Sequence, residues 1–282
     1  MPSRAEFDLE RLEAIDTYVR KVNPALVINC AAYTAVDAAE QEVERATRTN
    51  GQAPGSIASA ARDIGAGIIH ISANYVFEGD AQQPYRENEV CAPVSAYGQS
   101  KLKGDEAVMS AGPAHLILRT LWIYAARGKN FFCTMLRFGA ECETIRVVND
   151  QTGTLTSAPA LAGIIAELVR RMNGSPTEYL ARHSGVLNAT YSGQTTWHGF
   201  AMAIFDETRN RKMPLAVKTI QSITTAQYPT PARRPVYSVL DLTRLRQEFH
   251  IVPPPWHATL SDVIAQVKDF SLVSPDNSLR WH

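Results

Sequence analysis

The stretch GIIHISANYVFEG, from Gly67 to Gly79, decides the fold class of this chain. Residues 67–72 are a continuous apolar run around one histidine, and such runs are typical of strands covered on both faces. Polar and aromatic residues follow the run immediately. Because open α/β proteins place their chemistry at the carboxyl ends of parallel strands, we expect a functional site just after residue 72.

Short apolar runs alternate with helical patterns along most of the chain. Further runs that read as strands cover residues 25–31, 115–120, 145–148 and 186–190. Helical patterns cover residues 9–22, 51–64, 94–109, 130–141, 158–172, 195–210 and 258–269. This alternation predicts a parallel sheet with right-handed crossovers, followed by a smaller mixed α/β lobe. Residues 224–235, TTAQYPTPARRP, are rich in turn formers, so we expect no regular element there.

The composition indicates an ordinary globular protein. Of 282 residues, 45% are apolar and 20% are charged, and the 28 basic residues equal the 28 acidic ones. We therefore expect neither a nucleic-acid partner nor a membrane partner. The cysteines at 30, 91, 133 and 142 form no CxxC pair and no metal-ligand spacing, which favours reduced thiols in a cytoplasm and no structural zinc site.

The segment SAYGQSK places Tyr97 and Lys101 four residues apart on an expected helix. At that spacing both side chains share one face. A lysine ammonium one turn from a phenol favours the phenolate, which brings the phenol pKa toward the working range for acid–base catalysis. Taken alone, the pattern also fits a packed tyrosine beside a surface lysine, and that reading is the commoner one.

The chain closely resembles the dTDP-4-dehydrorhamnose reductase family of extended short-chain dehydrogenases/reductases. The resembling stretches run in order from near residue 4 to about residue 245. They are VINCAAYTAVDAAE, HISANYVFEG, PYRENEVCAPVSAYGQSK, LILRTLWIYAARGKNF, VVNDQTGTLTSA, SGQTTWHGFA and YPTPARRPVYSVLD. The breadth of this match, with YPTPARRP inside it, makes the resemblance specific.

The resemblance implies a role for each of several residues. Tyr97 would donate the proton, and Lys101 would assist it and contact the cofactor ribose. The expected cofactor-binding residues are Asp8, Leu9, Ala32, Tyr33 and Thr34, with Asp8 and Leu9 near the adenine. The expected substrate contacts are Asn74 and Trp122. From the residues alone, Trp122 reads as a core aromatic after a strand, and Asp8 equally as a helix N-cap or first-turn acid.

The resemblance also implies a fold and a reaction. Residues 1–150 would form a Rossmann-type doubly wound domain, and 151–282 mainly a substrate-binding lobe, with segments interleaved between the two. The reaction would be NADPH- or NADH-dependent reduction of the 4-keto group of dTDP-4-dehydro-L-rhamnose to dTDP-L-rhamnose, for nucleotide-sugar and cell-surface polysaccharide biosynthesis. The partner would be this nucleotide-sugar substrate; a homodimer and a Mg²⁺ ion are possible.

Two departures from the family pattern leave the activity open. The family usually carries Ser-Thr-Asp where this chain has Ser72, Ala73 and Asn74, and alanine cannot donate a hydrogen bond to the substrate carbonyl. No glycine-rich phosphate loop is present, so we expect the dinucleotide-binding domain to be N-terminally truncated, lacking its first strand, turn and helix. The alternatives are a non-catalytic binding or regulatory relative, and an active reductase whose reading frame begins further upstream.

Overall fold

The computed structural model describes residues 2–267, which divide into two units. The first unit comprises the residues up to Leu121 together with Gly163–Thr190 and Thr230–Val252. The second comprises Trp122–Ala162, Tyr191–Pro229 and the residues from Pro253 on. The chain therefore passes between the units several times. The functional division expected at residue 150 stays a prediction.

A sheet of four parallel strands forms the centre of the first unit. Its order is β1 (Leu26–Asn29), β2 (Gly67–Ala73), β3 (His115–Thr120) and β8 (Gly185–Asn188). The strands expected from the apolar runs are confirmed to within about two residues at each end. Because the neighbours are parallel, with Asn29 opposite His70 and Ala73 opposite Thr120, their carboxyl ends meet at one edge.

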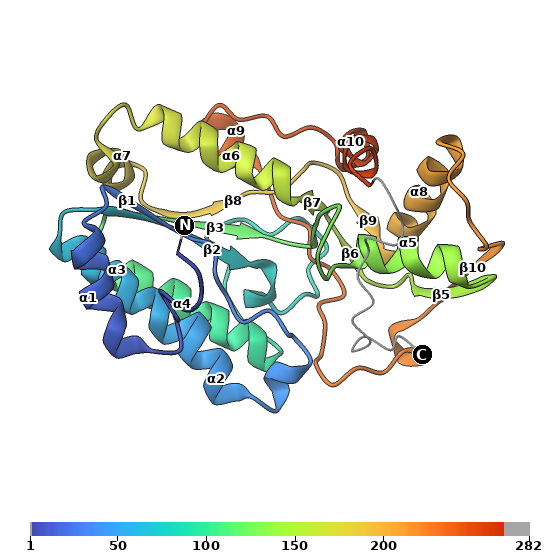
Figure 1. Ribbon diagram of the computed structural model, residues 1–282, viewed down its shortest axis with the longest axis horizontal. Helices are drawn as coiled ribbons and strands as arrows, with labels where there is room; N and C mark the ends of the chain where they lie inside the picture. Colours follow the sequence, from blue (N-terminus) through green and yellow to red (C-terminus); the bar gives the residue numbers. More distant parts are fainter. Residues whose placement is uncertain (1, 268–282) are drawn as a thin grey trace. The chain divides into compact units, whose positions relative to one another are not determined.

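Helices cover both faces of this sheet, which confirms the doubly wound class (Figure 1). One face carries α1 (Leu12–Val22), α3 (Ala53–Asp63) and α4 (Ala96–Ala111), which pack side by side. The other face carries α6 (Ala158–Arg171), α7 (Pro176–Arg182) and α9 (Thr243–Gln247). Short elements complete the connections: η1 (Ala38–Glu40), α2 (Val43–Thr47), the π-helical turn η2 (Arg48–Gln52) and η3 (Asn74–Val76).

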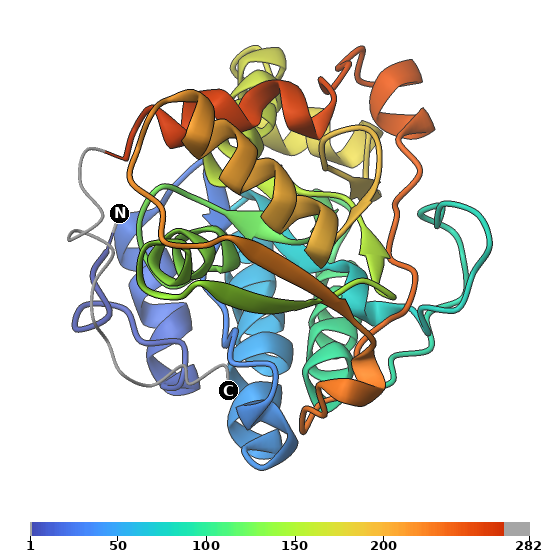
Figure 2. The same ribbon diagram turned by 90° about the vertical axis from the view of Figure 1, so that its right-hand side faces the viewer.

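The second unit is built from small strand pairs and helices. The parallel pairs are β5 (Thr144–Val148) with β10 (Thr219–Ile223), and β4 (Ile123–Tyr124) with β7 (Thr156–Ser157). An antiparallel pair joins β6 (Thr152–Gly153) to β9 (Thr195–Thr196). The helices are α5 (Phe131–Glu141), α8 (Trp197–Asn210) and α10 (Leu260–Ile264). Figure 2 shows β5 in green beside β10 in brown-orange, with α5 and α8 near them.

Several expectations for the later chain need correction. The run at 145–148 forms β5, but it pairs with β10 and not with the central sheet. Strand β10, with the sequence TIQSI, has too little apolar patterning to be recognised from sequence. The turn-rich stretch at 224–235 contains one 3-10 turn, η4 (Thr225–Gln227). The last helix begins as the 3-10 turn η5 (Trp256–Thr259), and its expected end at 268–269 lies outside the described residues.

The first unit depends on a close approach between α4 and η2. Gly104 lies in the interior of α4, and a Cβ atom there would overlap the carbonyl oxygen of Asn50. Helix interiors usually favour alanine over glycine by about 1 kcal/mol. Here the missing side chain is required because the two backbones touch.

Gly104→Ala should therefore destabilise the protein, by more than about 2 kcal/mol, through forced displacement of α4. Gly163→Ala is the matched control, since Gly163 is also helical and a Cβ there meets nothing within 4 Å. The control should leave the free energy of unfolding unchanged or raise it. Urea unfolding of both variants measures the difference, and equal stabilities would contradict this account of the helix contact.

Candidate functional site

The carboxyl ends of β1 and β2 bring several of the sequence-predicted residues together. Ala73, the last residue of β2, is buried in a small cluster with Tyr97 from α4. Tyr33, from the segment after β1, and Tyr75, from η3, pack against the same cluster. The rings of Tyr75 and Tyr97 meet edge to face, with centroids 5.2 Å apart. This cluster therefore brings together Tyr97, which is the expected proton donor, Ala73, and Tyr33, which is an expected cofactor contact.

Helix α4 presents Tyr97 and Lys101 on its buried face. The helix begins where the Ser95 hydroxyl accepts a hydrogen bond from the Gly98 amide at 3.1 Å, an ordinary N-cap. The Lys101 side chain is almost completely buried, and its ammonium donates a hydrogen bond to the Ile71 carbonyl oxygen at 2.7 Å. Tyr97 is buried as well. Lys101 is therefore anchored to the backbone of β2, two residues before that strand ends at Ala73.

Burial governs the protonation of both groups. It lowers the pKa of Lys101 to about 8, although the nearby Asp105 carboxylate acts in the opposite direction. Burial also raises the pKa of Tyr97, with smaller contributions from Tyr75 and Asp105. The Tyr97 pKa therefore moves away from neutrality, contrary to the direction that the Tyr-x-x-x-Lys pattern predicts. The reason is that desolvation disfavours the phenolate, while the Lys101 ammonium is directed to Ile71.

Asp105 and Arg119 form a buried ion pair beneath the site. Arg119 Nε lies 3.3 Å from Asp105 Oδ2, and both side chains are almost fully buried. Burial raises the pKa of Asp105, while Arg119 and the Ser72 hydroxyl lower it. His70, buried beside this cluster, contacts Asn29 at 3.1 Å through Nδ1. Its pKa is held well below the usual value by burial and then by Lys101, so the imidazole is neutral.

Ser72 Oγ is buried and has no hydrogen-bond partner among the described residues, whereas Ala73 packs against Tyr97. The two adjacent strand residues point to opposite faces of the sheet, as the alternation of a strand requires. Asn74 begins η3 with its side chain buried, and its amide Nδ2 has no hydrogen-bond partner within residues 2–267. Buried donors of this kind are costly unless a ligand or water meets them. The role expected of Asn74, a polar contact to the substrate, stays a prediction.

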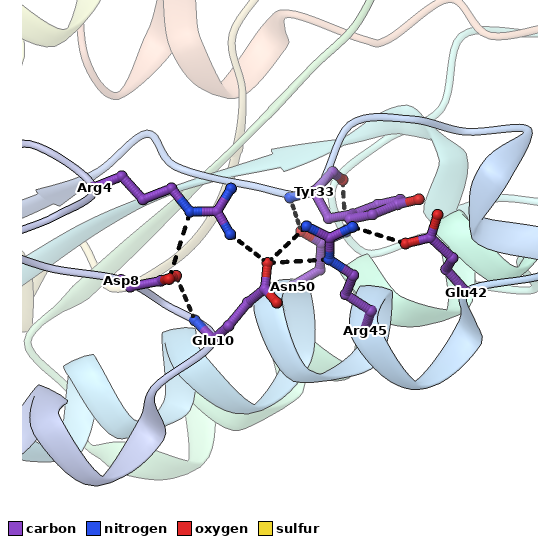
Figure 3. A network of polar contacts seen from close by, with 7 residues as sticks. All are labelled: Arg4, Asp8, Glu10, Tyr33, Glu42, Arg45 and Asn50. Carbon is purple, nitrogen blue, oxygen red and sulfur yellow. Dashed lines mark hydrogen bonds and ion pairs between the residues drawn. The ribbon is translucent and has the colours of Figure 1, made fainter.

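Asn50 holds the segment after β1 in place, although sequence reasoning missed it. Its Oδ1 accepts from the Tyr33 amide at 2.8 Å, and its Nδ2 donates to the Tyr33 carbonyl oxygen at 2.9 Å (Figure 3). The same Nδ2 lies 3.0 Å from the hydroxyl of Ser100, which in turn donates to the Tyr97 carbonyl oxygen. Asn50 therefore fixes the position of Tyr33 relative to the helix that carries Tyr97.

Asp8 belongs to a surface network of charged side chains. Asp8 Oδ1 accepts from the Glu10 amide at 3.0 Å, and Arg4 bridges Asp8 and Glu10. Glu10 also pairs with Arg45, whose guanidinium lies over the Tyr33 ring at 5.6 Å from its centroid (Figure 3). Asp8 is not the N-cap of α1, because that position belongs to Arg11. Leu9 is buried in the core between α1 and α3.

A second ion pair fixes the YPTPARRP segment on the first unit. Arg234 Nη2 lies 2.7 Å from Asp37 Oδ2, and Asp37 also accepts from the Ala232 amide at 3.1 Å. Partial burial would raise the Asp37 pKa, but Arg234 outweighs it and the pKa is lowered. Nearby, Gly79 has a φ of 88°, and a Cβ there would overlap Pro235. The glycine is required for this close approach.

Spacing could have revealed only part of this site. Asp105 stands four residues after Lys101 and eight after Tyr97, so helical periodicity places all three on one face. Arg119 is the single charge inside a buried run, which is itself a signal. The pairing of Asp37 with Arg234 spans 197 residues and has no local signature. Trp122 belongs to the second unit, where it is half-buried and stacks on Trp197 at 3.8 Å between centroids.

The segment after β1 has features that a nicotinamide cofactor would need. Residues 30–34 follow the carboxyl end of β1, are small at Ala31 and Ala32, and are partly or fully exposed. This allows the close backbone approach that a cofactor needs at a strand end. Within residues 2–267, no glycine-rich turn leads from a strand into a helix. In the same range, no group of three or more His, Cys, Asp or Glu side chains could hold a metal ion.

The Lys101 pKa predicts a pH dependence of stability. The folded protein holds this pKa at about 8, below the ordinary value of 10.5. Between these values the unfolded chain binds more protons, so the stability of the wild-type protein rises with pH. Lys101→Met should therefore be more stable than wild type near pH 7, by on the order of 1–3 kcal/mol, and this gap should shrink as pH approaches about 10.

Urea unfolding at several pH values between these limits tests the prediction. Lys103→Met is the matched control, because Lys103 lies on the same helix with its side chain exposed. The control should track wild type at every pH. A gap between Lys101→Met and wild type that stays constant or widens with pH would contradict the buried ammonium.

The clamp formed by Asn50 can be opened by one substitution. Asn50→Asp keeps an acceptor for the Tyr33 amide but removes the donors to Tyr33 and Ser100, and it buries a carboxylate. We expect a loss of about 2–3 kcal/mol in stability and faster hydrogen exchange at the Tyr33 amide. Arg48→Gln, in the same π-helical turn with an exposed side chain, is the control. Unchanged exchange at Tyr33 in the Asp variant would refute the clamp.

Comparison with known proteins places the chain in a family. The model of the RmlD substrate binding domain matches residues 1–269. A dTDP-4-dehydrorhamnose reductase of Burkholderia thailandensis is 43% identical over 261 residues, 90% of this chain and 86% of that protein. The Escherichia coli K12 dTDP-4-dehydrorhamnose reductase is 38% identical over 260 residues, 92% of this chain and 85% of that protein.

A solved structure agrees with these sequence matches. The dTDP-4-dehydrorhamnose reductase of Bacillus anthracis, in complex with NADP, superposes with a TM-score of 0.84 at 31% identity. The alignment covers 95% of this chain and 89% of that protein. The motifs around Tyr97 and Lys101, the doubly wound sheet and these matches agree, and the chain belongs to the dTDP-4-dehydrorhamnose reductase family.

Proposed function

We propose that this chain reduces the 4-keto group of dTDP-4-dehydro-L-rhamnose to give dTDP-L-rhamnose, with NADPH or NADH as reductant. Its relatives at 38% and 43% identity carry the name of this reductase. The observation that carries the proposal is the joint burial of Tyr97 and Lys101 on one face of α4, at the carboxyl edge of the sheet. When bound, the nicotinamide cofactor supplies the hydride.

Each residue of the first unit then has a role that follows from its position. Tyr97 holds the proton that the carbonyl oxygen receives, and its raised pKa keeps the phenol protonated at neutral pH. Lys101, anchored on Ile71, is positioned to restore that proton or to bind a ribose hydroxyl. Asn50 and Tyr33 hold the segment against which the cofactor rests. Burial of this cluster excludes water from the reacting groups.

The substrate contacts and the setting are also part of the proposal. Asn74 offers a buried, unpartnered amide among the described residues, and Trp122 offers a half-exposed indole. The four cysteines are free thiols, which fits the cytoplasm, where nucleotide sugars and reduced nicotinamide cofactors are made and used.

Ala73 favours a second candidate function, a relative that binds the nucleotide sugar without reducing it. It occupies the end of β2 beside Tyr97, where a hydroxyl donor would polarise the carbonyl. Ser72 does not replace that donor, since adjacent strand residues point to opposite faces of the sheet. Loss of one such donor usually lowers turnover by about 10²–10³, and binding changes less.

Turnover measurements separate the two functions. With dTDP-4-dehydrorhamnose and NADPH, Tyr97→Phe should lower turnover by at least about 10², because it removes the phenol proton that the carbonyl oxygen is proposed to receive. Ala73→Thr should raise turnover by about 10², with little change in substrate affinity. Loss of reduced-nicotinamide absorbance measures both rates.

Three outcomes would change the assignment. If Ala73→Thr leaves turnover unchanged while Tyr97→Phe removes it, another group or a bound water already donates at this position. A wild-type chain that binds dTDP-L-rhamnose without any turnover, with Ala73→Thr equally silent, would establish the binding relative. Full activity in Tyr97→Phe would remove the proposed acid from the mechanism.

A further inference from the structure

The indole of Trp122 is held by a second tryptophan that no sequence argument had singled out. Trp122 and Trp197 stack with centroids 3.8 Å apart and an interplanar angle of 21°. Both belong to the second unit and both are half-buried. The stack continues through Phe131, 4.7 Å from Trp197, to Phe200, 5.6 Å from Phe131. Trp122 is thus the outer member of an aromatic column rooted in the unit's core.

The backbone of Trp122 is strained in a way that requires support. Its φ of 44° lies in the left-handed region, which bulky residues rarely adopt. Such conformations persist only where the surroundings determine them, and they gather at functional sites. Here the surroundings are the stack on Trp197 and a long contact of 3.5 Å from the Thr156 amide to the Trp122 carbonyl oxygen.

The supporting indole is itself fixed by polar contacts. Trp197 Nε1 donates to Gln151 Oε1 at 3.2 Å, and the buried Gln151 donates through Nε2 to the Thr225 hydroxyl at 3.0 Å. That hydroxyl donates to Asp150 at 2.6 Å. Just before Trp197, Thr196 caps α8 by accepting from the Gly199 amide at 3.0 Å. Rotation of the Trp197 ring would therefore break its hydrogen bond to Gln151.

We propose that Trp197 is a positioning residue for the proposed reaction. Its stack, locked by Gln151, presents the Trp122 indole as a flat platform for the ring of a dTDP-linked sugar. The inference rests on the proposed function, because it takes Trp122 as a substrate contact. A stacked platform contributes equally to bound substrate and transition state, so its loss should raise KM and leave kcat nearly unchanged.

A spectroscopic signature tests the platform without any turnover. Two stacked indoles couple their electronic transitions and give an exciton couplet in the far-ultraviolet circular dichroism spectrum. Trp122→Phe and Trp197→Phe should both abolish the couplet. Trp256→Phe is the control, since Trp256 meets Phe200 edge-on at 6.2 Å and makes no ring contact with the stacked pair. Trp281, the remaining tryptophan, lies outside the described residues and is replaced by phenylalanine in every sample.

Ligand affinity then tests the function of the platform. With dTDP-L-rhamnose as probe in a calorimetric titration, Trp197→Leu should weaken binding about three- to tenfold, the worth of one aromatic contact. Trp197→Phe should weaken it less, and Gln151→Leu should weaken it while keeping both indoles. Trp256→Phe should bind as wild type does. In turnover, KM should rise by the same factor in Trp197→Leu, with kcat within about twofold.

The outcomes separate this inference from the function on which it rests. A couplet that survives Trp197→Phe would refute the stacked pair. Loss of the couplet with unchanged affinity for dTDP-L-rhamnose would refute only the positioning role and leave the reductase proposal intact. If the wild-type chain shows the couplet but has no affinity for dTDP-L-rhamnose, the proposed function is overturned, and so is the assignment of a dTDP-linked sugar to the platform.

Discussion

The buried ion pair between Asp105 and Arg119 is the constraint on which the first unit depends. Arg119 lies in β3 and pairs with Asp105 of α4. Its guanidinium also donates to the Glu87 carbonyl oxygen and contacts the Cys91 sulfur, both at 3.3 Å. One guanidinium therefore ties a central strand, the helix with the site residues and the loop that follows β2. Removing either partner would leave an uncompensated buried charge, which typically costs about 3–5 kcal/mol.

Burial sets the chemistry of Lys101, and Asp105 of this pair opposes its effect. Two cations, Lys101 and Arg119, are buried near one carboxylate, and the neutral His70 adds no charge. Desolvation of the ammonium favours loss of a proton from Lys101, while the Asp105 carboxylate acts in the opposite direction. This explains why the Lys101 pKa falls to about 8, close to the range in which a group can both give and take protons. The stability cost of burying the lysine and its usefulness to the reaction have one origin.

Sequence reasoning recovered what local patterns encode. The central strands followed from continuous apolar runs, as at 67–72 and 115–120, because strands buried on both faces need no alternation. In contrast, β10 was invisible because three of its five residues are exposed and its register comes from β5.

Sequence reasoning likewise predicted some residues of the site and missed others. Tyr97 and Lys101 were found by spacing, yet the Tyr97 pKa moves opposite to the direction that the spacing predicts, because burial is a tertiary property. Asn50 and the pair of Asp37 with Arg234 act across long sequence separations. No local pattern in a single sequence indicates such contacts. The four-residue spacing of Tyr97 and Lys101, in contrast, continues to Asp105 on the same helix.

Ala73 shows why fold and family do not by themselves determine activity. The residue is buried and packs beside Tyr97. A hydroxyl at this position would act mainly in the transition state, where the carbonyl oxygen gains charge. A chain that has lost that donor keeps its sheet, its buried lysine and its aromatic platform. Under the proposed function, binding and reduction would share one architecture, and the difference between them would rest on a single oxygen atom at the end of β2.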